Sequence, residues 1–366
     1  MANSIRPDRS NLGGDQAAEF SADFSFPFGS LSVSSNVESA IVALRDKFRY
    51  YPMVGNGSNA RTMEIIHARR SREYFDHILA KPSRRVRTGA GDFIHISTTD
   101  RREYLWWPPN MMVDFTPEDG SCGRVVVAHD LDEAIHPREA DRLRVKADGD
   151  EFDWELVADI AAGAFARDAG RVLLHAGMFR WKGASVMIGG ESGAGKTTAC
   201  LSMLRAGAKY AADDLCALGM DPSGHGVLCA GLLTPPNFVG QAPATLEELE
   251  AGLAGNGATW KSRGHAALES FMEAQPMADT TPTMVVILEK TDHRPPEHRF
   301  DILEEAEALE QIMGLLIDPS NVSRREFHLE IAIALLAQAV VVRATLAPHI
   351  NSLPEVFEKM LLEAKP

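Results

Sequence analysis

A glycine-rich segment in the second half of the chain has the residue types and spacing needed to bind phosphate. Residues 190–197 read GESGAGKT and match the P-loop (Walker A) pattern G-x-x-x-x-G-K-[ST] at every fixed position. Glycines allow the positive φ values that turn successive backbone N–H groups toward phosphate oxygens. Lys196 can reach the β- and γ-phosphates, and the Thr197 hydroxyl can bind Mg²⁺. The predicted nucleotide site comprises Gly190, Glu191, Ser192, Gly193, Ala194, Gly195, Lys196, Thr197 and Thr198.

Two adjacent carboxylates follow this segment. Asp213 and Asp214 come after a short apolar stretch, 209–212, which predicts a strand returning to the sheet beside the loop. One carboxylate can hold Mg²⁺ while the other accepts the proton of an attacking hydroxyl. His175 is a third candidate, although a single strand histidine is more often a packed core residue. The pattern favours phosphoryl transfer to a hydroxyl.

The elements expected around these residues alternate between strand and helix. Residues 184–188 predict a strand directly before the loop, and 197–205 predict a helix after it. The stretches 172–181 and 184–188 predict a hairpin with a tight turn at Lys182-Gly183. His175 is expected on the first strand of this hairpin. The context that a phosphate-binding loop requires is therefore predicted from the sequence.

The first part of the chain predicts a separate, sheet-rich region. Residues 1–20 lack periodicity and are typical of a flexible arm. Alternating apolar residues on both sides of Gly29 predict two short strands, and 37–48 predict a helix with Ser35 or Asn36 as its N-cap. Further strands are expected at 93–96, 104–107 and 124–128.

These patterns predict an α/β protein in three parts. The arm, residues 1–20, is followed by a smaller, sheet-rich α+β domain over 21–149, where substrate selection is expected. A P-loop domain with a mixed sheet follows over 150–366. A helix over 152–169, ending at Gly170, is expected to begin this second domain.

Composition argues against several other classes of protein. The chain has 366 residues, and its 37 basic and 51 acidic side chains give a net charge of −14, which makes a nucleic-acid partner unexpected. The longest apolar run, 331–342, is too short for a membrane span and predicts a buried helix. The N-terminus has no signal-peptide pattern. The four cysteines are too irregularly spaced for a disulfide scaffold, so we expect reduced core thiols and a cytoplasmic protein.

The segment 175–214 resembles the catalytic core of the HPr kinase/phosphorylase family and its related serine kinases. The shared features are the His-x-Gly at 175–177, the glycine-rich loop, the helix-to-strand passage RAGAKYAADD and the spacings between them. The resemblance extends loosely over 150–345. It implies a fold like that of HPr kinase and phosphoenolpyruvate carboxykinase, assembly into homo-oligomers, and ATP- and Mg²⁺-dependent transfer to a serine of a protein or peptide.

The resemblance also implies roles for individual residues. Asp213 would be the general base, Asp214 would bind Mg²⁺ with Thr197, and His175 and Lys196 would lie near the transferred phosphate. The chain departs from the family at 225–233, which has neither the Glu nor the Arg of the family's metal-binding segment. The family's later glycine-arginine-asparagine segment is not evident. The resemblance is therefore to a divergent relative, and it implies neither the reverse phosphorylase reaction nor HPr as substrate.

Three alternatives remain open. The acceptor hydroxyl could belong to a small molecule, since the same chemistry serves both acceptors. The chain could also be a binding module that uses the nucleotide as a switch. A GTPase is suggested by Glu289-Lys290-Thr291-Asp292 and by Asp221-Pro222-Ser223-Gly224, which resemble guanine-reading and DxxG motifs. However, Glu cannot reproduce the donor and acceptor pair of Asn, and the second segment is an ordinary turn sequence.

Overall fold

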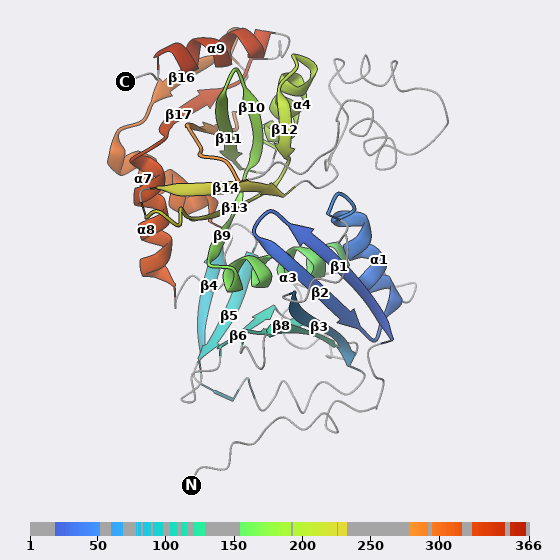
Figure 1. The fold of residues 1–366 in the computed structure, drawn as a ribbon. Coiled ribbons are helices and arrows are strands. Elements are labelled where there is room, and N and C mark those ends of the chain that lie inside the picture. Colours follow the sequence, from blue (N-terminus) through green and yellow to red (C-terminus); the bar gives the residue numbers. More distant parts are fainter. Residues whose placement is uncertain are drawn as a thin grey trace, which may run out of the picture. The chain divides into compact units, whose positions relative to one another are not determined.

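Within the described residues, the chain forms a mixed α/β fold in two units, with helices and three β-sheets that contain both parallel and antiparallel strands (Figure 1). The computed structural model describes residues 19–51, 60–68, 78, 80–81, 83–88, 91–97, 103–107, 111–115, 121–128, 154–191, 193–224, 226–232, 279–291, 295–316, 324–347 and 352–363. One unit comprises Met1–Ala169 with Asp318–Arg324, and the other comprises Gly170–Ile317 with Arg325–Pro366.

Within the described residues, the first unit contains one eight-stranded sheet in the order β1-β2-β3-β8-β7-β6-β5-β4. β2 pairs in parallel with β3, and β3 with β8, whereas the other neighbours are antiparallel. The strands predicted on both sides of Gly29 and in three later stretches are all present. The bounds are β1 (Phe20–Phe26), β2 (Gly29–Ser35), β3 (Arg61–Ala68), β4 (Ser83–Thr88), β5 (Gly91–Ser97), β6 (Glu103–Trp107), β7 (Met111–Asp114) and β8 (Ser121–Ala128).

Two helices, α1 (Glu38–Lys47) and α3 (Trp154–Asp168), pack against each other and against strands of this sheet (Figure 1). Phe165 of α3 is 1% exposed, and its ring centroid lies 5.5 Å from that of Phe26 and 5.4 Å from that of Phe28. Since α3 buries its apolar face here, the boundary between the units falls after Ala169. The sequence-based boundary at 149/150 had placed this helix in the second domain.

The start of α1 also differs from the prediction. Its N-cap is Val37 rather than Ser35 or Asn36. Ser35 is the last residue of β2 and is fully buried, so it belongs to the sheet. Its hydroxyl accepts a hydrogen bond from the Val37 N–H at 3.1 Å, which still satisfies a backbone donor next to the helix.

The second unit contains, within its described residues, a six-stranded sheet in the order β12-β10-β11-β15-β17-β16 and a three-stranded sheet in the order β14-β13-β9. β11 pairs in parallel with β15, and β15 with β17, while the other pairs are antiparallel. The bounds are β9 (Arg171–His175), β10 (Gly177–Trp181), β11 (Ala184–Gly190), β12 (Lys209–Ala212), β13 (Leu215–Met220), β14 (Val227–Leu232), β15 (Met284–Leu288), β16 (Arg299–Ile302) and β17 (Val340–Thr345).

Helices cover both sheets of this unit. α4 (Lys196–Arg205) contacts β10, β11, β12 and α9 (Leu353–Glu363), whereas α7 (Glu305–Leu315) packs on α8 (Arg325–Leu336), and α8 contacts β13 and β14 (Figure 1). Leu315 lies so close to Gly189 that a Cβ there would come within 2.4 Å of its Cδ1. The end of β11 is thereby held at the point where the glycine-rich loop begins. None of the described helices is long and apolar enough to cross a membrane.

The apolar run 331–342, predicted as one buried helix, is divided between two elements. α8 ends at Leu336 and β17 begins at Val340. Between them, the Gln338 side chain accepts a hydrogen bond from the Val227 N–H at 3.0 Å and donates one to the Val227 carbonyl at 2.9 Å. This contact with β14 helps to fix the turn after the helix, a tertiary interaction that local hydrophobicity does not reveal.

Candidate functional site

The glycine-rich loop connects β11, inside the six-stranded sheet, to α4. Gly190, Gly193 and Gly195 have φ values of +138°, +82° and +104°. Gly195 is the N-cap of α4, so the helix begins at Lys196 and its first backbone N–H groups face the loop. A strand, a turn rich in left-handed glycines and a helix N-terminus therefore follow one another, as the sequence predicted. Ser192 lies outside the described residues.

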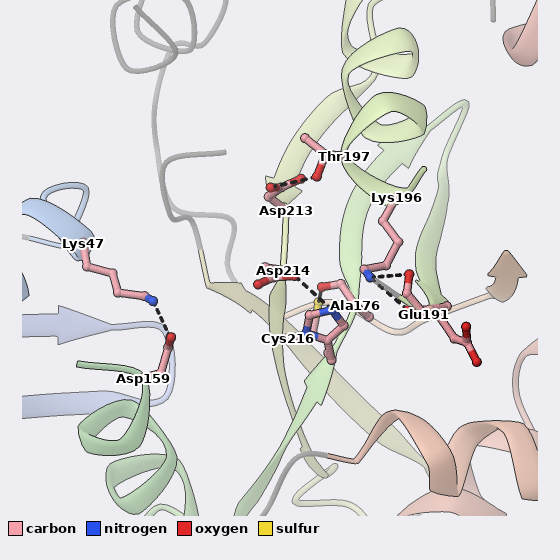
Figure 2. Close-up of polar contacts among 11 residues, drawn as sticks. Lys47, Asp159, Ala176, Glu191, Lys196, Thr197, Asp213, Asp214 and Cys216 are labelled. Carbon is pink, nitrogen blue, oxygen red and sulfur yellow. Dashed lines mark hydrogen bonds and ion pairs between the residues drawn. The ribbon is translucent and has the colours of Figure 1, made fainter. Parts of the chain in front are cut away.

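Lys196 lies inside the loop that precedes it. Its side chain is buried, and Nζ donates hydrogen bonds to the carbonyls of Gly190 at 2.9 Å and Glu191 at 3.3 Å (Figure 2). Burial lowers the pKa of Lys196, although the charges of Asp214 and Asp213 act in the opposite direction. The ammonium group is thus held at the centre of the loop by backbone oxygens.

The remaining loop residues of the predicted nucleotide site support this geometry. The Glu191 carbonyl also accepts a hydrogen bond from the Ala194 N–H at 3.1 Å, which closes the turn, while the Glu191 side chain is exposed. Ala194 is buried, and Thr198 is half-buried in the first turn of α4. The backbone of these residues, rather than their side chains, therefore shapes the loop.

Asp213 follows β12 and lies against the first turn of α4. The Thr197 hydroxyl donates a hydrogen bond to Asp213 Oδ2 at 3.1 Å, and Asp213 is only 2% exposed (Figure 2). The predicted strand at 209–212 is present as β12, which pairs with β10 at the edge of the sheet. The structure therefore places the first carboxylate on the hydroxyl that the sequence predicts as a metal ligand.

Asp214 lies beside His175 instead. His175 Nε2 is 3.2 Å from Asp214 Oδ1, and the Asp214 side chain is 44% exposed. The position follows from the three-stranded sheet, where His175 of β9 is opposite Leu215, the first residue of β13. Burial lowers the pKa of His175; Asp214 opposes this shift and Lys196 reinforces it. The two neighbouring carboxylates thus have different partners and very different exposure.

His175 does not occupy the element predicted for it. The expected strand 172–181 is interrupted at Ala176, so β9 and β10 belong to different sheets, and only β10 forms the hairpin with β11. The turn of that hairpin is at Lys182-Gly183, as predicted, with φ values of +48° and +87°.

Close packing accounts for the break in the strand. A Cβ on Gly177 would lie 2.6 Å from Cys200 Sγ and 2.9 Å from the Asp213 carbonyl oxygen. Cys216 Sγ donates to the Ala176 carbonyl at 3.3 Å (Figure 2). The chain therefore passes between α4 and the end of β12 without room for a side chain, and this passage brings His175 to the carboxylates. All four cysteines are buried and unbridged, as expected.

The segments that suggested a GTPase are used differently. Asp221–Gly224 forms the turn between β13 and β14, closed by the Gly224 N–H on the Asp221 carbonyl at 2.7 Å. At a strand rise of ~3.3 Å per residue, this turn is about 20 Å from Asp214. The Glu289 carboxylate binds Arg343 Nε at 3.0 Å, and Asp292 lies outside the described residues. Neither segment supports guanine recognition.

The sequence did not identify Arg343 as the partner of Glu289. It also predicted no structure for 225–233, the segment that departs from the pattern of the HPr kinase/phosphorylase family. Most of that segment forms β14, the outer partner of β13 in the three-stranded sheet. Across the described part of the chain, no group of three or more His, Cys, Asp and Glu side chains is arranged to hold a metal ion.

Comparisons with known proteins give a distant structural similarity. No family model and no curated protein matches the chain. Sixty chains of solved structures match. One of them, the Hpr(Ser) kinase/phosphatase from Coxiella burnetii, has 12% sequence identity and a TM-score of 0.28, over 52% of this chain and 88% of that chain. The similarity to this kinase/phosphatase thus concerns about half of the chain and is structural rather than sequence-based.

Proposed function

We propose that the second unit is an ATP- and Mg²⁺-dependent phosphotransferase that moves the γ-phosphoryl group to a hydroxyl. The observation that carries the proposal is the pair of carboxylates at the glycine-rich loop, with Asp213 on the Thr197 hydroxyl and Asp214 on His175. A nucleotide switch needs a carboxylate at the metal only. A transferase also needs an accessible group that can accept the proton of the attacking hydroxyl.

The chemistry of the loop suits Mg·ATP. Left-handed glycines and the N-terminus of α4 offer backbone N–H groups to an anion. Lys196 would exchange its carbonyl partners for phosphate oxygens, which are stronger acceptors because they are charged. Thr197 and Asp213 carry oxygen donors, the ligand type that Mg²⁺ prefers. Mg²⁺ would neutralise negative charge on the β- and γ-phosphates during transfer.

The geometry favours a division of roles opposite to the one that the sequence resemblance implies. Asp213 is buried and bonded to the expected metal-binding hydroxyl, so we assign it to the metal. Asp214 is open to an incoming acceptor and is oriented by His175. The acceptor proton passes to Asp214 while the acceptor oxygen bonds to the γ-phosphorus. The bond from that phosphorus to the leaving oxygen of ADP breaks in the same step.

Our first candidate for the acceptor is a serine of a protein or peptide, supported by the sequence resemblance of residues 175–214 to serine kinases. A small-molecule hydroxyl is the alternative, because Asp214 could serve either acceptor. A GTPase receives less support, because the Glu289 carboxylate binds Arg343 and Thr345 and is not available to a guanine base.

A label-transfer assay tests the proposal. Purified protein with Mg²⁺ and γ-phosphate-labelled ATP is incubated with fractionated extract of the source cell, in parallel with the Lys196→Ala variant. We expect label on a macromolecule or metabolite with the unmodified protein but not with Lys196→Ala. The size of the labelled species separates the two acceptor classes. Label released only as inorganic phosphate, at the same rate without extract, would instead indicate an ATPase or switch.

A further inference from the structure

A second lysine approaches the glycine-rich loop from the neighbouring strand. Lys290 lies two residues beyond the end of β15, the strand that pairs in parallel with β11. Its Nζ is 3.8 Å, and its Cε 3.9 Å, from the position that a Cβ on Gly193 would occupy. The ammonium group therefore lies against the left-handed turn at Gly193, and it comes from a different element than Lys196, the first residue of α4.

The residue before Lys290 anchors the chain at this point. The Glu289 N–H donates to the Ala344 carbonyl at 2.9 Å. The Glu289 carboxylate binds Arg343 Nε at 3.0 Å and accepts a hydrogen bond from the Thr345 hydroxyl at 3.3 Å. All three partners belong to β17. The backbone that carries Lys290 is thus tied to the sheet, and the Glu289 carboxylate before it is held by Arg343, which also binds Glu307.

The charge of Lys290 is not neutralised within the described part of the chain. The side chain is exposed, and no described carboxylate forms an ion pair with it. Lys196, by contrast, is buried and bonded to loop carbonyls. An exposed cation beside left-handed glycines and a helix N-terminus adds long-range attraction for a polyanion to a site that already offers hydrogen-bond donors.

We infer that Lys290 is a second phosphate-binding lysine, which holds the polyphosphate chain of the nucleotide at the Gly193 turn of the glycine-rich loop. This inference rests on the proposed nucleotide site and adds a positioning residue to it. Lys290 recognises phosphate oxygens rather than the base or ribose, so its charge should strengthen the binding of any ligand with a linear triphosphate.

Binding of inorganic tripolyphosphate and of Mg·ATP, measured by calorimetry at low ionic strength, tests the inference. Lys290→Ala is compared with Lys290→Arg and with Lys359→Ala, which removes an exposed lysine of α9 that pairs with Glu363. We expect Lys290→Ala to weaken the binding of both ligands about two- to fivefold, the range for one partly screened charge contact. Lys290→Arg should retain most of the affinity, Lys359→Ala all of it, and added salt should reduce the difference.

Two results would overturn the role of Lys290 and leave the nucleotide site intact. One is wild-type affinity of Lys290→Ala for both ligands while Lys196→Ala loses both. The other is a loss on Mg·ATP without a loss on tripolyphosphate, which would place Lys290 at the nucleoside. If the unmodified protein binds neither ligand, the proposed function fails together with the inference.

Discussion

The two units stabilise their interiors in different ways. In the first, aromatic rings dominate the contact between helices and sheet, with Phe24, Phe26, Phe48, Tyr51 and Phe165 all buried. In the second, backbone and side chains pack so closely that an added Cβ would lie 2.4–2.6 Å from another atom at five glycines, namely Gly177, Gly189, Gly190, Gly226 and Gly231. At Gly29 and Gly123 of the first unit, the nearest such approaches are 3.3 Å and 3.1 Å.

The tight packing in the second unit coincides with its buried charges. Lys196 and Asp213 are 7% and 2% exposed. Lys196 donates to the carbonyl of the crowded Gly190, and the Asp213 carbonyl crowds Gly177. Buried charges are tolerated only when their partners are held in place. The second unit thus combines close backbone packing with buried charged groups at the glycine-rich loop, whereas buried aromatic rings dominate the described contacts between helices and sheet in the first unit.

The largest effect on stability should come from the aromatic core. Phe165→Ala removes a fully buried ring from α3, and we expect a loss of about 3–5 kcal/mol in the free energy of unfolding, as for other large-to-small core changes. Urea denaturation followed by circular dichroism measures it. Because Phe165 has no part in the site, the affinity of the folded variant for Mg·ATP should not change. A changed affinity would break the distinction between the two units.

A single added carbon at Gly177 should have the next largest effect. Gly177→Ala places a methyl group within 3.0 Å of Cys200 Sγ and the Asp213 carbonyl, so we expect about 1–3 kcal/mol of destabilisation. The same change at Gly314 of α7, where no atom lies within 4 Å, serves as the matched control. That variant should be more stable by about 0.5–1 kcal/mol, because alanine is the better helix former. Equal effects at both positions would contradict the crowding described for the second unit.

The sequence predicted the local features of this site better than the tertiary ones. The loop at 190–197, the turn at Lys182-Gly183 and the strand at 209–212 depend on residues close in sequence, and all are present. The break at Ala176-Gly177 could not be predicted, because it depends on Cys200 and Asp213. The apolar run 331–342 was misread for a similar reason, since periodicity alone does not distinguish a buried helix from a buried strand.

The partners of the two carboxylates could not be predicted from the sequence either. Asp213 and Asp214 are adjacent, yet Asp213 contacts Thr197, whereas Asp214 contacts His175 on β9 of the three-stranded sheet. Only the pairing of β13 with β9 brings His175 to this point. Likewise, the anchoring of Glu289 by β17 depends on a parallel pairing between strands distant in sequence.

The smallest effect concerns pH. Burial lowers the pKa of His175 from its ordinary value of 6.5, so the unfolded chain takes up a proton more readily than the folded protein. Stability should therefore decrease as the pH falls below 6.5, until the folded state also binds the proton. Urea denaturation of the wild type and of His175→Gln on both sides of this pH measures the contribution. The variant should lose less stability on acidification, and an identical loss would show that His175 does not titrate as described.

The measurement that tests the central claim most directly compares Asp213→Asn with Asp214→Asn in two assays, the affinity for ATP with and without Mg²⁺ and the rate of γ-phosphoryl transfer. We predict that Asp214→Asn binds Mg·ATP like the wild type but transfers label ~10²-fold more slowly or worse, as expected for a lost general base. Asp213→Asn should lose the part of the affinity that depends on Mg²⁺. Loss of the Mg²⁺ dependence in Asp214→Asn alone would reverse the two roles, and full transfer activity in both variants would contradict the proposed phosphotransferase site.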